Sequence, residues 1–313
     1  MPGPRTSGKG GRSGRLRDGR PTFVWSLPAL LFFALFSVVP LGVAVYLSFT
    51  EYEGIPLLPP RWVGLENWSR MLEDAALHRA VVVTIVLIVA AVLTQVPISL
   101  LIGVWAAGPQ RNRAVISALY FIPLLMSSAA ITVLFASILD PNFGVPATLR
   151  DVFGLGADNV FSNLLGNQWT ALGVIAFIYL WGSSPLHTLL YQGGARNIPP
   201  VLYEAAAMDG AGPVQQFFRI TIPMLRNTIV TSTIIMVVGT FTSFDIILLL
   251  TRGGPSGGTS NLPYFMYDQG IASLDFGYGS AVATLLIVIA TLTSVAMVKA
   301  TGYDKMSGTQ EGI

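Results

Sequence analysis

Several hydroxyl-bearing and acidic side chains lie within long apolar runs of this sequence. Their types and spacing would allow them to bind a polar solute. Tyr179 and Ser183 lie four residues apart, and Thr240, Ser243 and Asp245 follow in a later run. Residues four apart share one face of a helix, so Tyr179 and Ser183 can act together. Hydroxyl groups donate and accept hydrogen bonds, and an aromatic ring covers apolar C–H groups. The set therefore suits recognition of a polyhydroxylated solute such as a carbohydrate.

Each of these residues also has a simpler interpretation. Small hydroxyl residues inside apolar helices often serve packing, because they let two helix backbones approach closely. Asp245 either faces a ligand or pairs with Arg252, which lies seven residues on and so on the same helical face. Of these, the sequence favours the ion pair, or a water-exposed outer position. Gln95 and His187 are expected to find local hydrogen bonds.

The sequence lacks the residue patterns of an enzyme. Its lysines, Lys9, Lys299 and Lys305, are followed by Gly, Ala and Met, so there is no G-x-x-x-x-G-K-[ST] phosphate loop. His78 and His187 have no second ligand at metal spacing, and there is no cysteine. A G-x-S-x-G nucleophile motif is also missing. We therefore predict no catalytic residue, no metal site and no cofactor in this chain.

The elements that position the hydroxyl residues are membrane-spanning helices. The chain has 313 residues, 52% of them hydrophobic and 11% charged, with a mean hydropathy of +0.63. That composition predicts an all-α integral membrane protein. A span needs about 20 apolar residues. Six segments are long enough: 23–49, 80–107, 114–138, 170–194, 228–250 and 278–299.

The prolines within the six segments, and the depth of the hydroxyl residues along them, add detail to the predicted spans. Five prolines lie inside the six segments, where we expect kinks rather than breaks: Pro28, Pro40, Pro97, Pro123 and Pro185. At 1.5 Å per residue, Tyr179 and Ser183 lie roughly 14 to 20 Å inward along the fourth segment. By the same rise, the 239–243 stretch lies roughly 18 to 24 Å outward along the fifth segment. Both sets are expected in the central to outer part of the bilayer.

The distribution of basic residues predicts the orientation. Residues 1–20 form a basic stretch with hardly an apolar residue, which indicates a disordered cytoplasmic tail. With that tail inside, 13 of the 18 lysines and arginines lie on the inner side, as the positive-inside rule requires. Both termini are then cytoplasmic, and so is the polar loop between the fourth and fifth segments.

That polar loop, residues 201–225, is predicted to contain two short helices. Pro199 and Pro200 can open the first helix, since their missing N–H groups fall where helical donors are unpaired. Gly210 tolerates left-handed backbone and can stop it, and Pro213 can begin the second helix. We expect Pro223 to end the second helix.

The first helix of the loop has the form of a knob that a larger groove could grip. Ala205, Ala206 and Ala207 make it narrow, and Glu204 offers a carboxylate to an arginine. The alternative is that the alanines only favour helix formation and that Glu204 only interacts with the helix dipole. Spacing alone leaves both interpretations open.

Two motifs carry a resemblance to a known family. Residues 204–206 (EAA), 209–212 (DGAG) and 220–223 (ITIP) resemble the EAA loop of binding-protein-dependent ABC importer permeases. Residues 251–255 (TRGGP) look like the T-x-G-G-P signature of maltose-type sugar permeases. The resemblance extends loosely over residues 81–299. It implies the type I importer permease fold, with six transmembrane helices and a cytoplasmic coupling helix between spans 4 and 5.

The resemblance also implies site residues. The loop is expected to dock into a cleft of a separate ATPase through Glu204, Ala205, Ala206, Asp209, Gly210 and Phe217. The sugar cavity is expected to be lined by Tyr179, Ser183, Leu186, Met236, Gly239, Thr240 and Ser243. Met236 and Thr240 stand where members of the family can carry longer polar side chains, which leaves the size of the sugar open.

The implied partners complete a transport machine in a bacterial-type inner membrane. They are a second permease that forms a heterodimer with this chain, two ATPase subunits that bind ATP and Mg, and an extracytoplasmic solute-binding protein that meets the outer loops. No nucleic acid is implied. The two permeases would rock around the cavity by alternating access. Residues 21–77 would form the first span and outer loop, residues 78–300 the transmembrane domain with its coupling loop at 199–226, and residues 301–313 a cytoplasmic tail.

Three other function classes fit parts of the sequence. An ion-driven secondary transporter should bury ionisable residues in several spans, and here only Asp245 qualifies. A membrane-embedded enzyme or scaffold is disfavoured by the missing catalytic patterns. The same importer could instead carry an amino acid, a polyamine or a glycerol phosphate ester. The absence of a basic cluster within the spans argues against a strongly anionic cargo.

Overall fold

The computed structural model describes residues 23–55, 58–108, 111–154, 156 and 159–301. The predicted tail at 1–20 and nearly all of the tail at 301–313 lie outside this part of the chain. The chain divides into two compact units, Met1–Val43 and Ala44–Ile313. Each unit is described by itself.

The first unit is helical over its described residues. Helix α1 (Phe23–Phe33) continues through a π-helical turn, η1 (Ala34–Val38), into α2 (Val39–Leu47), whose last residues belong to the second unit. The stretch Trp25–Leu47 is long and apolar enough to cross a membrane. This agrees with the first predicted span, and the helix continues through Pro28 as predicted.

Three long helices form the frame of the second unit: α4 (Ala75–Ala106), α8 (Gln168–Arg196) and α15 (Phe276–Thr301). Each is long and apolar enough to cross a membrane. Helices α4 and α8 continue through Pro97 and Pro185, as predicted, and pack along each other. Gly103 permits this packing, because a Cβ there would lie 2.8 Å from the carbonyl oxygen of Thr188.

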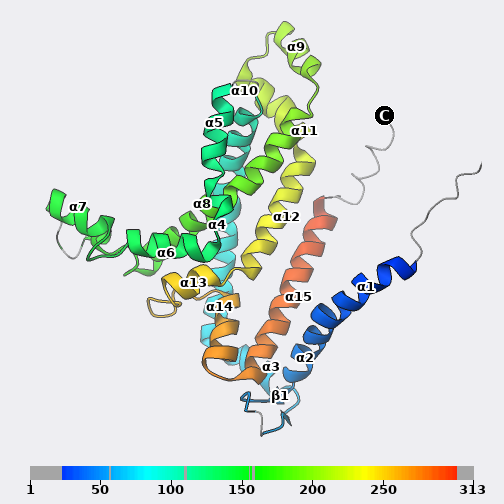
Figure 1. Ribbon diagram of the computed structural model, residues 1–313, viewed down its shortest axis with the longest axis vertical. Helices are drawn as coiled ribbons and strands as arrows, with labels where there is room; N and C mark the ends of the chain where they lie inside the picture. Colours follow the sequence, from blue (N-terminus) through cyan, green and yellow to red (C-terminus); the bar gives the residue numbers. More distant parts are fainter. Residues whose placement is uncertain (1–22, 56–57, 109–110, 155, 157–158, 302–313) are drawn as a thin grey trace, which may run out of the picture. The chain divides into compact units, whose positions relative to one another are not determined.

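The third predicted span is not one helix, so that prediction was wrong. It consists of α5 (Arg111–Tyr120), a 3-10 turn η2 (Ile122–Leu125) and α6 (Ser128–Ile138). Pro123 lies in the 3-10 turn, and the hydroxyl of Ser127 accepts a hydrogen bond from the amide of Ala130 at 3.2 Å. This cap starts a new helix, and α6 runs across the direction of α4 and α8 (Figure 1). Pro123 therefore marks a break rather than a kink.

The fifth predicted span is also interrupted. Helix α12 (Arg226–Thr242) ends before Ser243 and Phe244, and a short helix α13 (Asp245–Leu250) follows. In the part of the chain that the structure describes, four helices can cross a membrane by length and composition. The number rises to five if the bent pair Pro213–Met224 and Arg226–Thr242 counts as one span. The predicted helical membrane fold is thus present, with two of its six segments broken.

Shorter elements connect the long helices. Strands β1 (Thr50–Glu51) and β2 (Arg61–Trp62) pair antiparallel, and α3 (Glu66–Glu73) follows them. Helix α7 (Val145–Phe153) and the 3-10 turn η3 (Val160–Ser162) precede α8. Helix α14 (Leu262–Tyr267) and the π-helical turn η5 (Asp268–Ala272) precede α15. The β1–β2 end of this unit lies opposite the end that carries α9 (Pro200–Met208) (Figure 1).

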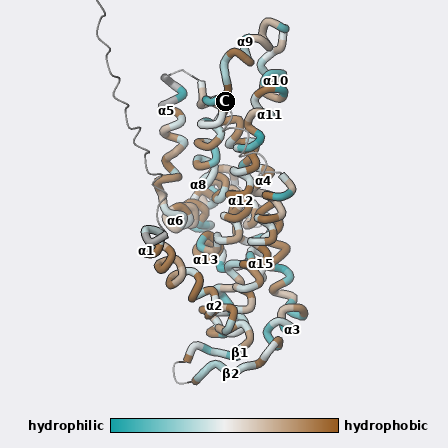
Figure 2. Tube along the Cα trace, turned by 90° about the vertical axis from the view of Figure 1, so that its right-hand side faces the viewer, coloured by the Kyte–Doolittle hydropathy of each residue, from teal (hydrophilic) through white to brown (hydrophobic). Residues whose placement is uncertain are grey.

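Buried side chains of the second unit form three clusters. The cluster with Ile131, Ile175 and Ile247 joins α4, α6, α8, α13 and α14. A second cluster joins α3, α4, α14 and α15, and a third joins α4 and α8 to the polar loop. Outside these clusters many large apolar side chains are exposed, and Figure 2 shows hydrophobic residues along most of the helix lengths. A membrane accounts for such a surface, because soluble proteins rarely expose so much apolar area.

Candidate functional site

The polar loop folds into two short helical segments separated by a turn, as predicted. Helix α9 is followed by α10 (Pro213–Gln216), a π-helical turn η4 (Phe217–Thr221) and α11 (Ile222–Met224). Gly210 adopts a φ of 82°, and the amide of Ala211 donates to the carbonyl of Ala206 at 2.8 Å. This closure explains why α9 ends where the sequence indicated. Pro223 does not end the second segment, because the helix extends to Met224.

One side of the loop presents apolar side chains that are largely exposed within the described part of the chain. Neither α9 nor α10 contains a buried residue. Met208, Val214 and Phe218 have exposed fractions of 83%, 72% and 62%. Glu204 and Ala205 are exposed on the same helix α9. Apolar residues gathered on a projecting loop indicate a surface that another protein covers.

The other side of the loop is fastened to the transmembrane helices. The hydroxyls of Tyr203 and Thr221 are hydrogen-bonded at 2.9 Å, which ties α9 to η4. Phe217 is half-buried and packs against the cluster that contains Tyr191 and Leu225. A displacement of the loop would therefore be passed directly to α8 and α12.

The structure separates the six residues predicted for coupling into two groups. Glu204, Ala205, Asp209 and Gly210 are exposed, whereas Ala206 and Phe217 are half-buried. Phe217 lies on the side of the loop that meets the helices, so it belongs to the attachment of the loop rather than to its free surface. Sequence reasoning missed the exposed Met208 and Val214, although their apolar character beside the Gly210 turn was a usable signal.

A cavity of about 520 Å³ lies where the broken helices meet α8. Three of the seven residues predicted to bind substrate line it: Tyr179, Ser183 and Ser243. The other lining residues are Pro123, Leu124, Met126, Ser128, Ile131, Ile178, Gly182, Thr242, Phe244, Asp245 and Ile246. The mixture of hydroxyl, aromatic and apolar groups suits a solute with both polar and apolar faces.

Hydrogen bonds hold the polar residues of the cavity in place. The hydroxyl of Ser183 donates either to Gln95 Oε1 at 2.9 Å or to the carbonyl of Tyr179 at 2.5 Å. The hydroxyl of Tyr179 donates to the carbonyl of Ser243 at 3.3 Å. The expectation of a local hydrogen bond for Gln95 is confirmed. His187 likewise bonds through Nδ1 to the hydroxyl of Ser232 at 2.9 Å.

The remaining four predicted residues lie away from the cavity. Met236 and Thr240 are buried on the side of α12 that packs against other helices of this unit, and the Thr240 hydroxyl donates to the carbonyl of Met236 at 3.0 Å. Leu186 is 40% exposed, and Gly239 has open space where a Cβ would stand. The fold of this chain alone therefore brings together Tyr179, Ser183 and Ser243 but not these four.

Asp245 does not form the ion pair with Arg252 that was one of its two favoured positions; its hydrogen bond is exposed, which agrees with the water-exposed alternative. Its carboxylate accepts a hydrogen bond from the hydroxyl of Ser128, and it lines the cavity. Arg252 has a φ of 49° and lies beyond the end of α13, so the expected seven-residue helical spacing is broken. The sequence analysis did not identify Ser128 as a partner of Asp245. Its position shortly after Pro123, where a new helix can begin, was the available signal.

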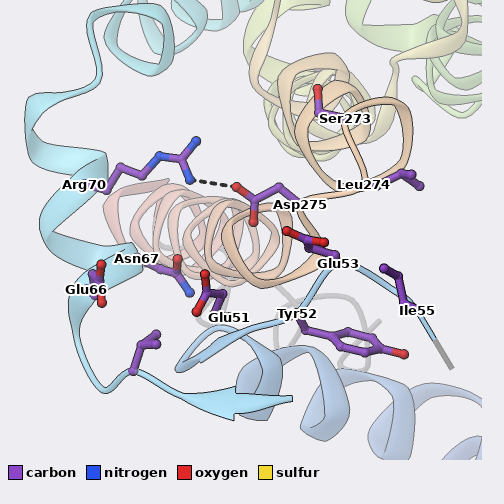
Figure 3. A pocket seen from close by; sticks show the side chains of 11 residues that line it. Glu51, Tyr52, Glu53, Ile55, Glu66, Asn67, Arg70, Ser273, Leu274 and Asp275 are labelled. Carbon is purple, nitrogen blue, oxygen red and sulfur yellow. Dashed lines mark hydrogen bonds and ion pairs between the residues drawn. The ribbon is translucent and has the colours of Figure 1, made fainter. Parts of the chain in front are cut away.

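A second cavity of about 520 Å³ lies at the β1–β2 end and is rich in carboxylates (Figure 3). Its lining includes Glu51, Glu53, Glu66, Arg70 and Asp275. Arg70 Nη1 and Asp275 Oδ2 form an ion pair at 2.7 Å. This ion pair joins α3 to the residue that precedes α15. The two charges therefore stabilise the contact between α3 and α15.

Asp74 strengthens the same attachment. Its carboxylate accepts hydrogen bonds from the amides of Ala76 and Leu77 at 2.8 and 3.2 Å, and from the Tyr278 hydroxyl at 2.7 Å. Burial raises the pKa of this carboxyl. The three hydrogen bonds and the nearby charge of Arg70 outweigh burial and hold the pKa of Asp74 below its usual value.

Comparison with known proteins covers both the loop and the cavity. Residues 99–300 match the family described as binding-protein-dependent transport system inner membrane component. The multiple sugar-binding transport system permease protein MsmF of Streptococcus mutans is 27% identical, over 86% of this chain and 91% of that relative. The sn-glycerol-3-phosphate transport system permease protein UgpA of Brucella abortus is 30% identical, over 84% and 88%. A solved bacterial ABC transporter involved in the import of the acidic polysaccharide alginate shares the fold. It has a TM-score of 0.77 and 20% identity, over 89% of this chain and 94% of that one.

Proposed function

We propose a transport function for this chain, which belongs to the family of binding-protein-dependent transport system inner membrane components. The chain is the permease subunit of an ATP-driven importer and carries a carbohydrate across the membrane. One observation supports this most: the loop that exposes Met208 and Val214 is packed, through Phe217, on the helices that frame the cavity. That arrangement can convert a force on the loop into a movement of the cavity walls.

The energy comes from partner chains. Two ATPase subunits bind ATP and Mg, and one of them grips α9 through Glu204 and the exposed apolar residues. Exposed apolar side chains fit an apolar groove on a partner, and the Glu204 carboxylate can bind a cationic side chain at its edge. The loop then faces the cytoplasm, both termini are cytoplasmic and the β1–β2 end faces outward, in agreement with the positive-inside rule.

A second permease completes the pathway. Leu186 and Gly239 are exposed in this chain, so they can line a cavity formed jointly with a neighbouring subunit. We propose a heterodimer of this chain with a sister permease, supplied with cargo by an extracytoplasmic binding protein. The two permeases rock so that the cavity opens alternately to either side.

The cargo that the cavity supports best is an uncharged carbohydrate. Disaccharides and oligosaccharides are the first candidates to test. Tyr179 and Ser183 supply hydroxyl groups, and the cavity lining contains no Lys, Arg or His among the residues that the structure describes. The name of the Streptococcus mutans relative agrees with a sugar cargo. The Brucella abortus relative instead favours a glycerol phosphate ester as the second candidate. Ligand screening of the binding protein that purifies with the complex distinguishes the two.

The proposed docking role is tested by reversing the charge of Glu204. Glu204→Lys should leave membrane insertion intact but abolish uptake and the co-purification of the ATPase, because the carboxylate no longer meets its cationic partner. Glu73→Lys, an exposed carboxylate at the β1–β2 end, serves as the control and should retain the ATPase. Undiminished uptake by the Glu204→Lys complex would contradict the proposal.

A further inference from the structure

The two broken segments meet at the cavity. Helix α6 begins at Ser128 and helix α13 begins at Asp245, and both residues line the cavity. Helices α6 and α13 are packed against each other beside α8 (Figure 1). We refer to α6 and α13 together as the half-helix pair.

A charge-assisted hydrogen bond joins the pair at its cavity end. The hydroxyl of Ser128 donates to the carboxylate of Asp245. Ser128 is exposed and Asp245 is half-buried, so the carboxylate faces the cavity rather than a packed interior. An ionisable residue that faces a cavity within membrane helices is usually paired. Hydrogen bonds to a charged acceptor are also stronger than neutral ones. This bond is therefore a specific fastening between two segments more than a hundred residues apart.

Apolar packing continues the fastening away from the cavity. Ile131 lies one turn along α6 from Ser128, and Ile246 and Ile247 follow Asp245 in α13. All three isoleucines are buried in one cluster, which also contains residues of α8, but α6 packs more extensively against α13 than against α8. Because packed interiors deform little, the two half-helices are expected to behave as one body.

The break that precedes α13 is itself supported by side chains. The carbonyl of Ser243 accepts hydrogen bonds from the hydroxyl of Tyr179 at 3.3 Å and from Asn261 Nδ2 at 2.8 Å. A broken helix is tolerated in a membrane protein where other groups satisfy its freed backbone. The interruption between α12 and α13 is thus a stable feature of the cavity wall.

We propose that Asp245 is a positioning residue for transport. Its bond to Ser128 makes the half-helix pair a single wall of the cavity, and this wall moves as one body while access to the cavity alternates. The proposal rests on the proposed transport function and adds a specific moving part to it. Asp245 acts through Ser128 and not through contact with the cargo.

Substitutions separate positioning from cargo contact. Asp245→Ala should lower uptake by about tenfold, because the Ser128 hydroxyl loses its acceptor. Asp245→Asn keeps the side-chain volume and an acceptor oxygen, so it should restore most of the uptake. The concentration of loaded binding protein that gives the half-maximal uptake rate should not change. A shift of that concentration in Asp245→Asn, with an unchanged maximal rate, would indicate direct cargo contact and overturn the proposal.

Cross-linking tests the single-body claim directly, because the chain contains no cysteine. In the complete complex in proteoliposomes, Ser128→Cys/Asp245→Cys is joined with a short bis-methanethiosulfonate linker. The unlinked double variant lacks the Ser128–Asp245 bond and should be slow, and the link should raise its uptake because it replaces that bond. A control link between Ser183→Cys and Asp245→Cys spans the cavity and should stop uptake until a reductant is added. Arrest by the first link, or equal tolerance of both links, would overturn the proposal.

A second measurement leaves the Ser128–Asp245 bond intact. Leu134 in α6 and Leu249 in α13 are exposed, so spin labels at cysteines there disturb little packing. The distance between the labels should stay the same in the nucleotide-free and ATP-bound complex, and a change of more than about one helical turn, 5.4 Å, would overturn the proposal. Loss of uptake in the wild-type complex would instead indicate failure of the proposed function.

Discussion

The loop at 199–226 and the cavity beside α8 differ in how far contacts within this chain hold their side chains in place. Neither α9 nor α10 has a buried residue, and Met208 and Val214 are largely exposed within the described part of the chain. The cavity residues Tyr179 and Ser183 are instead fixed by hydrogen bonds to neighbouring elements. The loop is therefore the surface on which we propose that a partner binds, whereas the cavity is largely organised by its own chain.

This difference implies that substitutions in the two regions fail in different ways. A change on the free side of the loop should impair docking and leave the fold intact. A change where helices pack should lower stability, and a change in the cavity should alter handling of the cargo. The helix contact at Gly103 lies between the two regions and provides the strongest test.

Gly103→Leu should abolish accumulation of the protein in the membrane. A Cβ at this position already meets the Thr188 carbonyl oxygen and the Tyr191 Cβ at 2.8 Å, so a larger side chain forces α4 and α8 apart. Gly173→Leu is the matched control in α8, where a Cβ has no neighbour within 4 Å. Membrane levels measured by immunoblot should differ sharply between the variants, and equal levels would refute this account of α4–α8 packing.

Phe217→Ala and Phe218→Ala distinguish the two sides of the loop. Phe217 packs on the cluster below it, so its truncation should lower the free energy of unfolding by about 2 kcal/mol. Phe218 is exposed and contacts the Phe217 ring edge to face, so its truncation should lower stability much less while weakening binding of the ATPase. Thermal unfolding and co-purification measure the two effects. The distinction fails if both variants lose stability alike.

Tyr179→Phe tests the cavity with the removal of one hydroxyl. The loss of its bond to the Ser243 carbonyl should reduce uptake at low cargo concentration by about threefold to tenfold. Tyr203→Phe removes a comparable hydroxyl contact in the loop, to Thr221, and should leave the cargo concentration at half-maximal uptake unchanged. Identical uptake curves for the two variants would show that the cavity assignment is wrong.

The smallest expected effect is a pH dependence at the β1–β2 end. The pKa of Asp74 is lowered in the fold, so its contribution to stability is complete above the pKa of the unfolded chain. The contribution is lost as pH falls through the lowered folded value, on the acid side of about pH 4. Asp74→Asn should flatten this acid dependence of the unfolding temperature, while Asp151→Asn, an exposed carboxylate, should retain it.

The sequence predicted the loop better than the cavity because the signals of the loop are local. Pro200 and Gly210 determine where α9 begins and ends through their own backbone preferences. The break at Ser243 depends on partners distant in sequence, since Tyr179 and Asn261 donate hydrogen bonds to its carbonyl. No periodicity in the apolar runs reveals such partners.

The cavity residues show the same limit. Tyr179 and Ser183 share a face of a long helix, so their spacing was enough to place them together. Met236 and Thr240 were expected beside them but are buried, because contacts with other helices decide which face of α12 points inward. Helical spacing determines which residues share a face, while tertiary packing determines where that face points.

The central claim is that α9 and the turn after it contact an ATPase inside the cell, and a photo-crosslinker at Met208 tests it most directly. Met208 is 83% exposed and lies about one helical turn from Glu204 on α9, so p-benzoylphenylalanine there leaves the packed side of the loop untouched. Irradiation of the membrane complex should join this chain to the nucleotide-hydrolysing subunit. Cross-links to lipid alone, or to an extracytoplasmic protein, would contradict the account.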